Sequence, residues 1–519
     1  MPRLLSWGTA LLLSSLSLLF LSCGKTPGEE NGDDPGAGYT QVKPAFNRTK
    51  VLKNPLNGWV MYGSGSGDPS YWDTEIYVEE KGANVRVRDY ASAAYIRTYW
   101  AAMNPADGVY AWRDPSTAIY KMIHGALDRG LPIAFRFNVD GRDQRRNTPK
   151  FVTDAGAAYG VENTKFPDRI TPMPQDPIFQ KYYEKFLTAL AEDFNDPEIC
   201  AFIDGYGLGK WGEGHTVAYD PNNLTLVDGN TTRLKEEVMD WITKAYASRF
   251  TKVPLVLNYH RSVGHPVSGT QPDSEKLVSI AVTNGYCLRS DAFGMNDYYG
   301  NWERSIVNTW RYKRPVIMEG GWIVGQHSYW NDPAGYRRDH PEDVRKGEYD
   351  ASKEARVNMM DFRVGQETQS WFTDAFVYVQ QFVTEGGYRL YPDLVSLPAS
   401  VRAGASVKIS SRWRNMGWGY CPNNIPQWNF KYKVAFAILD QTDKPVKVFV
   451  DDKCEPSSWV ESKPNSYEFQ VRADVAPGNY KWAVAIVDTT RDNTPGIQLA
   501  VNNDVSDDGW VKLMNLKVE

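Results

Sequence analysis

The chain has 519 residues, of which 42% are hydrophobic, 13% aromatic and 23% charged. This length exceeds that of one ordinary domain, so we expect two or three globular domains with large cores. The formal net charge of -5 gives no basic footprint, which excludes nucleic acid as an expected partner. The 18 tryptophans and 30 tyrosines slightly favour carbohydrate, because aromatic faces stack well on the apolar faces of sugar rings.

Residues 1–22 predict a signal peptide. Arg3 supplies a positive start, an apolar run covers residues 4–22, and Cys23 follows where the peptide would be cut. The run is short for a membrane anchor, which needs about 20 apolar residues, and a plain secretory peptide is the alternative. The segment resembles a bacterial lipoprotein signal, which implies lipidation of Cys23 and contact with the outer membrane through the lipid only.

Residues 23–45 predict a flexible acidic tether. They begin with a stretch rich in Gly, Pro and acidic side chains, which cannot bury enough apolar surface to fold. An acidic patch directly after the lipidated cysteine is similar to the surface-export signal of Gram-negative gut bacteria. We therefore expect an outer-membrane lipoprotein that is exposed on the cell surface.

Residues 46–391 predict a parallel α/β domain, because short apolar runs alternate with amphipathic helical segments. Helices are expected over 117–130, 178–194 and 234–250. Eight strands are expected, at 58–63, 93–100, 131–139, 199–207, 253–260, 292–299, 314–321 and 359–365. Eight strands over this length favour a (β/α)8 TIM barrel with its active site at the carboxyl ends of the strands, and a doubly wound sheet is the competing architecture.

Residues 392–519 predict an antiparallel, Ig-like β-sandwich domain. Alternating polar and apolar runs such as SVKISSRWRN and NYKWAVAIV are separated by turns such as DQTDKP. Cys421 and Cys454 both lie in this domain, in an oxidising compartment, and are a possible disulfide. Cys200 and Cys287 lie in apolar runs and are expected to be buried thiols. The histidines and cysteines show no metal-binding spacing, so we expect neither a metal nor another cofactor.

The stretch GYGLGKWGEGH, residues 205–215, permits two interpretations. Its glycines fit the spacing of a dinucleotide-binding turn, but that turn must open a helix and be followed by an acid at a second strand end. Here the next residues are rich in Asn, Pro and Gly, and Asp228 falls in a turn. The stretch therefore favours the second interpretation, in which Glu213 is an acid presented at the barrel mouth.

A second carboxylate ends another predicted strand. Glu319, in RPVIMEGGW, follows an apolar run on the seventh predicted strand, whereas Glu213 follows the fourth. Glycoside hydrolysis needs one carboxylic acid to protonate the leaving oxygen and one carboxylate to attack the anomeric carbon or activate water. A structural role in salt bridges is the alternative for either residue alone.

At these residues the chain resembles the clan A glycoside hydrolases, whose (β/α)8 barrels carry the acid/base Glu after the fourth strand and the nucleophilic Glu after the seventh. The resemblance implies Glu213 as acid/base and Glu319 as nucleophile of a retaining reaction on β-linked glycosides, galactosides or related pyranosides. It also implies that Arg97 contacts the nucleophile and that Tyr298 or Tyr299 is the sixth-strand tyrosine. The chain departs from the family at Gly212, where an Asn is usual.

Other polar and aromatic residues near the predicted strand ends are candidates for binding an oligo- or polysaccharide. Together with Arg97, Tyr298 and Tyr299, the substrate-binding candidates are Trp100, Arg136, Asn138, Trp211, Asn258, His260, Asp297 and Trp322. Each polar residue has a structural alternative as a satisfied core group, and each tryptophan has one in core packing. The expected function is a glycoside hydrolase, and the alternative is a non-catalytic cell-surface glycan-binding lipoprotein, which the glycine at position 212 favours.

Overall fold

The computed structural model describes residues 38–65, 67–293, 298–322, 324 and 341–519. The signal peptide, Cys23 and Asp297 lie outside the described residues. Within these ranges, no helix is both long and apolar enough to cross a membrane.

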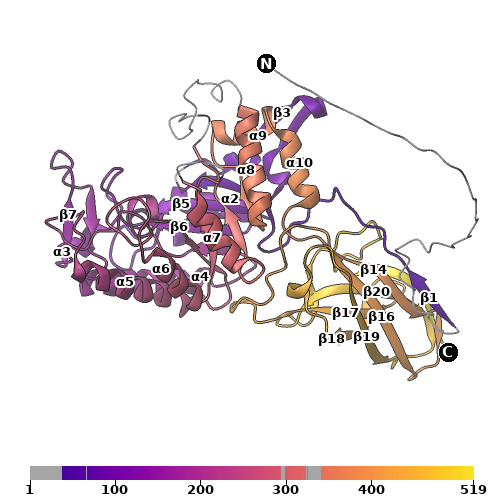
Figure 1. Cartoon of the computed structure of the whole chain (residues 1–519). Helices are drawn as coiled ribbons and strands as arrows, with labels where there is room; N and C mark the ends of the chain where they lie inside the picture. Colours follow the sequence, from indigo (N-terminus) through magenta and orange to yellow (C-terminus); the bar gives the residue numbers. More distant parts are fainter. Residues whose placement is uncertain (1–37, 66, 294–297, 323, 325–340) are drawn as a thin grey trace, which may run out of the picture.

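A closed barrel of eight parallel strands forms the first domain, as predicted (Figure 1). Its strands, in order around the barrel, are β2 (Gly58–Ser64), β5 (Ala91–Tyr99), β6 (Ile133–Asn138), β9 (Cys200–Asp204), β10 (Leu255–Asn258), β11 (Tyr286–Ser290), β12 (Val316–Met318) and β13 (Met359–Asp361). Every residue of β6, β10 and β11 is buried, as expected for strands covered on both faces.

Helices surround most of the barrel. They are α1 (Trp100–Met103), α2 (Ala118–Leu127), α3 (Lys150–Asp154), α4 (Pro177–Phe194), α5 (Gly229–Ala247), α6 (Ser274–Thr283), α7 (Asn301–Trp310), α8 (Pro341–Ala355), α9 (Gln366–Thr373) and α10 (Phe376–Glu385). α4 shows why these segments are helical. Asp176 caps its first turn by accepting from the amides of Ile178 and Phe179, Pro177 occupies the first turn, and the apolar side of the helix packs on the barrel. Two small hairpins complete the domain, β3 (Glu75–Val78) with β4 (Ala83–Arg86) and β7 (Tyr159–Val161) with β8 (Ile170–Pro172).

The sixth barrel strand is not where the sequence predicted it. The strand is β11, whereas the expected run was 292–299. Gly285 has a φ of +94°, which turns the chain sharply from the end of α6 into β11. Ala292 has a φ of +53°, which is incompatible with a strand, so the run AFGMNDYY begins in the loop beyond the strand. The correction matters because β11 carries Arg289.

The second domain is the predicted sandwich of two sheets, which are antiparallel except where β15 (Ser400–Val401) pairs parallel with β22 (Val511–Val518). One sheet contains β1 (Tyr39–Val42), β14 (Leu390–Pro398), β16 (Ser406–Asn415) and β19 (Asn465–Arg472). The other contains β15 (Ser400–Val401), β22 (Val511–Val518), β20 (Gly478–Asp488), β17 (Tyr432–Leu439), β18 (Pro445–Asp451) and β21 (Thr494–Ile497). β14 begins two residues before the expected boundary at 392.

The predicted tether is wrong over its last residues. Residues 39–42 form strand β1, which pairs antiparallel with β14 from Tyr39 opposite Pro398 to Val42 opposite Val395. Backbone pairing along the sheet edge orders this stretch, and Asn47 extends the attachment by donating its amide to the carbonyl of Ala500 at 2.8 Å.

The sandwich covers the end of the barrel from which the strands start. One apolar cluster runs from barrel-interior residues such as Phe202 and Val256 into the sandwich core at Trp413. Polar contacts reach the loops that precede the strands: Trp418 donates to the carbonyl of Val357 at 2.7 Å, just before β13. The opposite end, where the strands finish, is therefore left for a site (Figure 1).

The predicted disulfide is wrong. Cys421 and Cys454 are both buried free thiols, and Cys454 Sγ donates to Asp451 Oδ2 at 3.2 Å instead of bonding to a second sulfur. Burial raises the pKa of both thiols, so both stay protonated. Cys200 and Cys287 are buried free thiols as expected.

Candidate active site at the carboxyl end of the barrel

A row of charged side chains crosses three neighbouring barrel strands. In the parallel register, Arg97 on β5 lies beside Arg136 on β6, and Arg136 lies beside Asp204 on β9. Arg136 is fully buried, and its Nε donates to Asp204 Oδ2 at 2.7 Å. The Tyr95 hydroxyl donates to the same oxygen at 3.2 Å. Burial lowers the pKa of Arg136, but the neighbouring Asp204 and Glu213 carboxylates outweigh it and hold that pKa well above its usual value.

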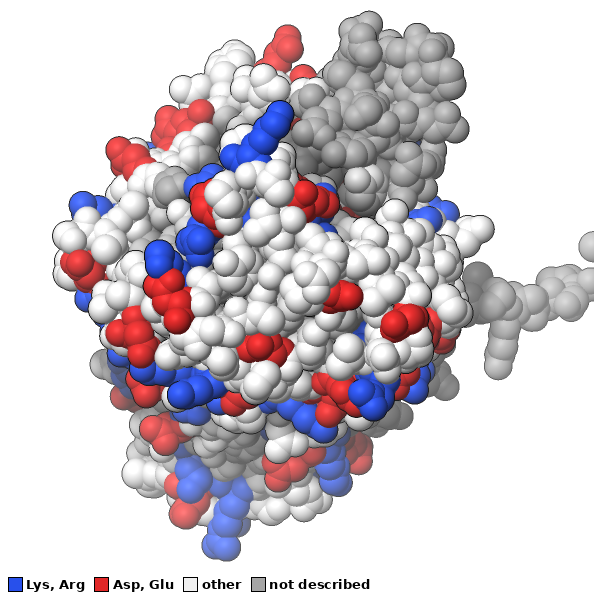
Figure 2. Space-filling model, turned by 90° about the vertical axis from the view of Figure 1, so that its left-hand side faces the viewer, with Lys and Arg blue, Asp and Glu red and all other residues white. Residues whose placement is uncertain are grey.

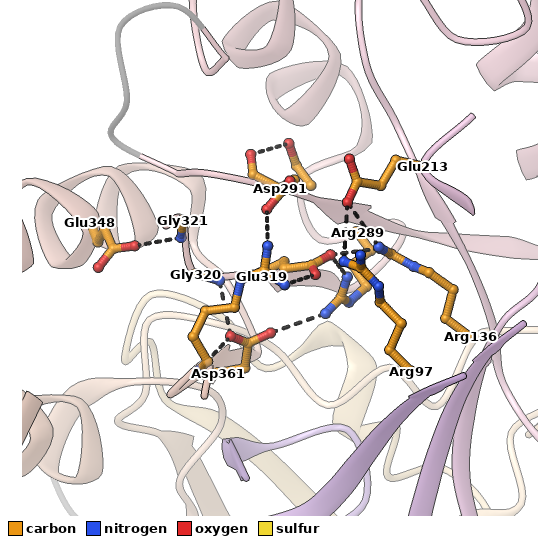
Figure 3. A network of polar contacts seen from close by, with 12 residues as sticks. Arg97, Arg136, Glu213, Arg289, Asp291, Glu319, Gly320, Gly321, Glu348 and Asp361 are labelled. Carbon is orange, nitrogen blue, oxygen red and sulfur yellow. Dashed lines mark hydrogen bonds and ion pairs between the residues drawn. The ribbon is translucent and has the colours of Figure 1, made fainter. Parts of the chain in front are cut away.

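Glu319 lies directly after β12 at the centre of this charged layer (Figure 3). Its Oε2 accepts from Arg136 Nη2 at 2.6 Å and from Arg289 Nη1, and its Oε1 accepts from Arg363 Nη1 at 2.5 Å. The side chain is fully buried. Three guanidinium groups from three different barrel segments therefore hold this carboxylate in one orientation.

Glu213 lies in the loop after β9 and faces the same arginine. Arg136 Nη1 donates to Glu213 Oε1 at 3.2 Å, while Arg97 Nη1 lies 3.6 Å from that oxygen and His215 Nε2 lies 3.3 Å from Oε2. One planar guanidinium thus bridges Glu213 and Glu319. Its two contacts and the width of its fork place the bridged oxygens at most about 8 Å apart.

The glycines of residues 205–215 build this loop and do not open an α-helix as a dinucleotide-binding turn does, since the next α-helix, α5, begins at Gly229. Gly209 and Gly212 have φ values of +73° and +74°, and a Cβ on Gly209 would lie 2.1 Å from the carbonyl oxygen of His215. A Cβ on Gly212 would lie 2.6 Å from Asn138 Oδ1. The tight path returns the chain so that Glu213 faces the barrel axis, and Asn138 occupies the space that a side chain at position 212 would need.

Asp361 lies below Glu319 in Figure 3, and Arg289 contacts both carboxylates. Asp361 Oδ2 accepts from Arg289 Nη2 at 3.0 Å, and its Oδ1 accepts from the amide of Gly320 at 3.0 Å. Burial raises the pKa of Asp361, against the lowering effect of Arg289 and Arg363. The residue that follows Glu319 is thus held by a carboxylate on the next strand.

Glu348 on α8 holds the next amide. Its Oε1 accepts from the amide of Gly321 at 3.0 Å, and its Oε2 accepts from Arg345 Nη1 at 2.6 Å. Arg345 also binds Glu367, whose carboxylate accepts from the amide of Val324 at 2.9 Å. Burial raises the pKa of Glu348 to about 7, although Arg345 and the Gly321 amide act in the opposite direction.

This raised pKa predicts a pH-dependent stability. In the unfolded chain Glu348 titrates near its ordinary value of 4.5. Its contribution to stability is therefore complete below pH 4.5 and is lost as the pH rises to about 7. Relative to wild type, Glu348→Gln is expected to gain on the order of 3 kcal/mol of unfolding free energy between pH 4.5 and 8. Urea unfolding of both proteins across this range measures the gain.

The control for this prediction lies on the same helix. Glu354 is half-exposed, so Glu354→Gln should differ from wild type by a nearly constant amount over the same pH range. A pH-independent difference between Glu348→Gln and wild type would contradict the prediction.

The structure brings several predicted site residues together. Arg97, Arg136, Glu213 and Glu319 form the network above, although Arg97 pairs with Glu213, whereas the resemblance placed it beside Glu319. Asn138 and Asn258 are buried at the ends of β6 and β10, and Asn138 Oδ1 and Asn258 Nδ2 have no hydrogen-bond partner. Such unpaired buried groups at a barrel mouth are suited to sugar hydroxyls.

The five aromatic candidates divide between the barrel mouth and the core, and His260 lies at the mouth with Trp211, Tyr298 and Trp322. Trp211 has its ring 5.4 Å from that of His215. The rings of His260 and Tyr298 lie 6.4 Å apart, and burial, then the charge of His215, lowers the pKa of His260 to about 4, which leaves it neutral at pH 7. Trp322 is 40% exposed, and Arg363 lies over its ring at 5.2 Å.

The predictions for Trp100 and Tyr299 as substrate-binding residues are wrong. Trp100 has no exposed surface and packs edge-on against Phe179 and Tyr183 of α4. Tyr299 is 3% exposed and stacks on Phe293 at 4.2 Å. The ring of Trp100 faces α4, the ring of Tyr299 packs on a loop residue, and both rings belong to the same apolar core cluster.

Sequence reasoning missed Arg289, Arg363, Asp361 and His215. Arg289 was missed because β11 was misplaced, and the signal that could have found it is an arginine inside the apolar run YCLRS. Arg363 and Asp361 lie within the predicted eighth strand, where a charged pair in a buried strand is such a signal. His215 belongs to the quoted glycine-rich stretch. Among the described residues, no group of three or more His, Cys, Asp or Glu side chains is placed to hold a metal ion.

No protein-family model and no curated protein matches the chain. Solved structures that resemble it include an endo-β-1,4-mannanase from Thermotoga petrophila, with 11% identity, a TM-score of 0.38, and coverage of 90% of this chain and 98% of that one. Endo-glycoceramidase II from Rhodococcus sp. has 12% identity, a TM-score of 0.37, and coverage of 83% and 100%. Pseudomonas stutzeri endoglucanase Cel5A has 10% identity, a TM-score of 0.36, and coverage of 66% and 95%. At these identities and TM-scores the likeness carries no argument about function.

Proposed function

We propose that the protein is a glycoside hydrolase that cleaves β-linked glycosides, galactosides or related pyranosides, with Glu213 as acid/base and Glu319 as nucleophile. One observation carries the proposal: two carboxylates from the ends of two barrel strands meet the same guanidinium, that of Arg136, at the catalytic end of a (β/α)8 barrel. The upper bound of about 8 Å on the distance between the bridged oxygens is compatible with the roughly 5 to 5.5 Å of retaining enzymes and also reaches into the roughly 6.5 to 9.5 Å of inverting ones, so the anomer of the first product decides between the two mechanisms.

The contacts of Glu319 suit a nucleophile. An ionised carboxylate offers about four acceptor positions, and three are taken by Arg136, Arg289 and Arg363. The remaining position lies on Oε1, which is the oxygen we assign to attack. The three guanidinium groups also fix the orientation of the carboxylate, as attack along one line requires.

The proposed reaction has two steps. In the first, Glu213 donates its proton to the glycosidic oxygen as that bond breaks, the aglycone leaves as an alcohol, and Glu319 Oε1 bonds to the anomeric carbon. In the second, Glu213 takes a proton from water, the resulting hydroxide attacks the anomeric carbon, and Glu319 is released as a carboxylate. Two inversions give net retention.

The test uses purified protein with aryl β-glycosides and β-linked polysaccharides, and follows the anomer of the first product by proton NMR. We expect the β-anomer to appear first. Glu213→Gln should lower kcat/KM by about 10² to 10⁴ for poor leaving groups and much less for dinitrophenolate, which needs no acid. Glu162→Gln, at an exposed position, is the control that should behave as wild type. An initial α-anomer would overturn the retaining mechanism. If none of the substrates is hydrolysed, the proposal that the protein is an enzyme is overturned.

A second candidate function is that of a non-catalytic glycan-binding protein. The enclosure of the Glu319 carboxylate by arginines favours it. Both of its oxygens are engaged by arginines and the side chain has no exposed surface. This candidate predicts glycan binding without turnover, and binding that survives Glu319→Gln. For either candidate we propose attachment to the outer membrane through a lipid on Cys23, with the barrel mouth on the cell exterior.

A further inference from the structure

A cavity of about 300 Å³ opens beside the carboxylate pair, over the ends of β2, β5 and β6. Arginine, amide and aromatic side chains shape it, since its lining includes Arg97, Tyr99, Asn138, Gln144 and Arg145. Arg97 also faces Glu213, so the cavity adjoins the proposed acid/base. A sugar ring bound at the carboxylates therefore has this cavity as its neighbour.

Both arginines of the cavity have spare hydrogen-bonding capacity. Arg97 is largely buried, and among the described residues the one carboxylate within ion-pair distance is Glu213, at 3.6 Å. Arg145 lies over the ring of Tyr99 at 5.2 Å, and in the described part of the chain no carboxylate lies within ion-pair distance of it. A guanidinium has five donors, so most donors of both groups are free for a ligand.

The acidic side chains of the same loop do not supply the missing charge. Asp140 is held by Arg142, with a contact of 2.5 Å, and Asp143 faces Lys210 at 3.9 Å. On the face that Figure 2 shows, by contrast, blue and red side chains are interspersed. The cavity is thus a local excess of positive charge in a chain whose net charge is -5.

The proposed chemistry increases this excess. When Glu213 carries the proton for the leaving oxygen, Arg97 loses the charge of its one carboxylate partner among the described residues. An anion on the substrate would replace that partner. Asn138 adds an acceptor for a sugar hydroxyl, since its Oδ1 is buried without a partner at the edge of the cavity.

We infer that this cavity is a subsite for an acidic sugar, in which Arg97 and Arg145 bind the carboxylate of a uronate or the sulfate of a sulfated pyranose. Planar forked donors suit both anions, and the ring of Tyr99 holds the Arg145 guanidinium in place. The inference rests on the proposed function and deepens it, because it assigns the substrate class to acidic β-glycans.

Binding of hydrolysis-resistant probes tests the subsite without any turnover. The probes are phenyl 1-thio-β-D-glucuronide, phenyl 1-thio-β-D-galacturonide and the 6-sulfate of phenyl 1-thio-β-D-galactoside, with the neutral glucoside and galactoside as references. Calorimetric titration of the wild type is expected to show at least one acidic probe bound about tenfold or more tightly than its neutral counterpart. Preference for a uronide or for the sulfate identifies the source of the anion.

Two variants of one loop make the test specific. Arg145→Gln should remove most of the acidic preference and leave the affinity for neutral probes unchanged, and Arg145→Lys should retain part of the preference. Arg146→Gln is the matched control, because Arg146 faces Thr153 Oγ1 at 3.5 Å and does not line the cavity. Equal affinity for acidic and neutral probes would overturn the inference, and so would equal losses in Arg145→Gln and Arg146→Gln.

The outcome separates the inference from the proposed function. If the protein prefers acidic probes through Arg145 but does not hydrolyse the O-linked counterparts, the subsite is supported and the proposed enzymatic function is overturned. If the protein hydrolyses neutral glycosides and shows no preference for acidic probes, the proposed enzymatic function is supported and the acidic subsite is overturned.

Discussion

Glu319→Gln is expected to lower kcat/KM by a factor on the order of 10³ to 10⁵, more than any other single substitution we consider. The amide is not a nucleophile, so no glycosyl-enzyme bond forms. Its NH₂ group must also face one of the three arginines that now bind the two carboxylate oxygens. Steady-state rates on the best substrate of the screen measure the loss.

Stability and chemistry must be separated in this variant, because Glu319 is a buried charge. Asp488→Asn is the control: Asp488 is a buried carboxylate of the sandwich that binds Lys431 at 2.6 Å, and its loss should lower stability without lowering kcat/KM of the folded protein.

The Glu319→Gly variant tests the same assignment through a gain of activity. In the space left by the side chain, azide should restore turnover and give an α-glycosyl azide, because it attacks from the face that Glu319 used. Wild-type turnover in the Glu319→Gln protein would show that Glu319 is not the nucleophile.

The barrel was predictable from sequence because its strands are buried on both faces and read as apolar runs bounded by turns. The placement of β11 failed for a local reason. Its five residues, YCLRS, include an arginine and a serine, so the more aromatic run after it looked like the better strand. Short strands that carry inward charges lack the hydrophobic signal on which the prediction depends.

The site was predictable only in part, since sequence order gives strand ends but not which side chains converge on one atom. Glu213 and Glu319 were found because each ends a recognisable motif. The three arginines that bind Glu319 come from β6, β11 and the loop after β13, and their meeting depends on barrel closure. Trp100 shows the converse: its position next to a strand end suggested the mouth, but its ring faces α4.

Arg136→Met is expected to lower the free energy of unfolding by about 3 to 5 kcal/mol. Arg136 has no exposed surface and contacts Asp204, Glu213 and Glu319. Methionine fills a similar volume without charge, and it leaves Asp204 with the Tyr95 hydroxyl and with Arg289 at 3.5 Å. The loss arises because the buried carboxylates of Asp204, Glu213 and Glu319 keep their charges without the guanidinium that they share, and denaturant unfolding measures it.

A double variant checks that cause. Because Asp204 loses its best partner, Arg136→Met combined with Asp204→Asn should recover much of the stability that the single variant loses, whereas independent sites would show additive losses. Arg136→Lys keeps the positive charge, but its single ammonium group cannot contact the three carboxylates as the forked guanidinium does. It should therefore recover less of the lost stability than the double variant. A cost below about 1 kcal/mol for Arg136→Met would show that the three carboxylates are not held by this residue.

The same variant tests whether Arg136 orders the two carboxylates for catalysis. Under conditions where Arg136→Met is folded, kcat should fall by about 10²-fold while KM changes little, because the substrate still meets the cavity but the two carboxylates lose their common guanidinium. The Arg136→Met, Asp204→Asn double variant should regain stability without regaining kcat. Since Asp204 contacts Arg136 through Nε and the two glutamates contact Nη1 and Nη2, one side chain joins the stability of the barrel to the geometry of the site.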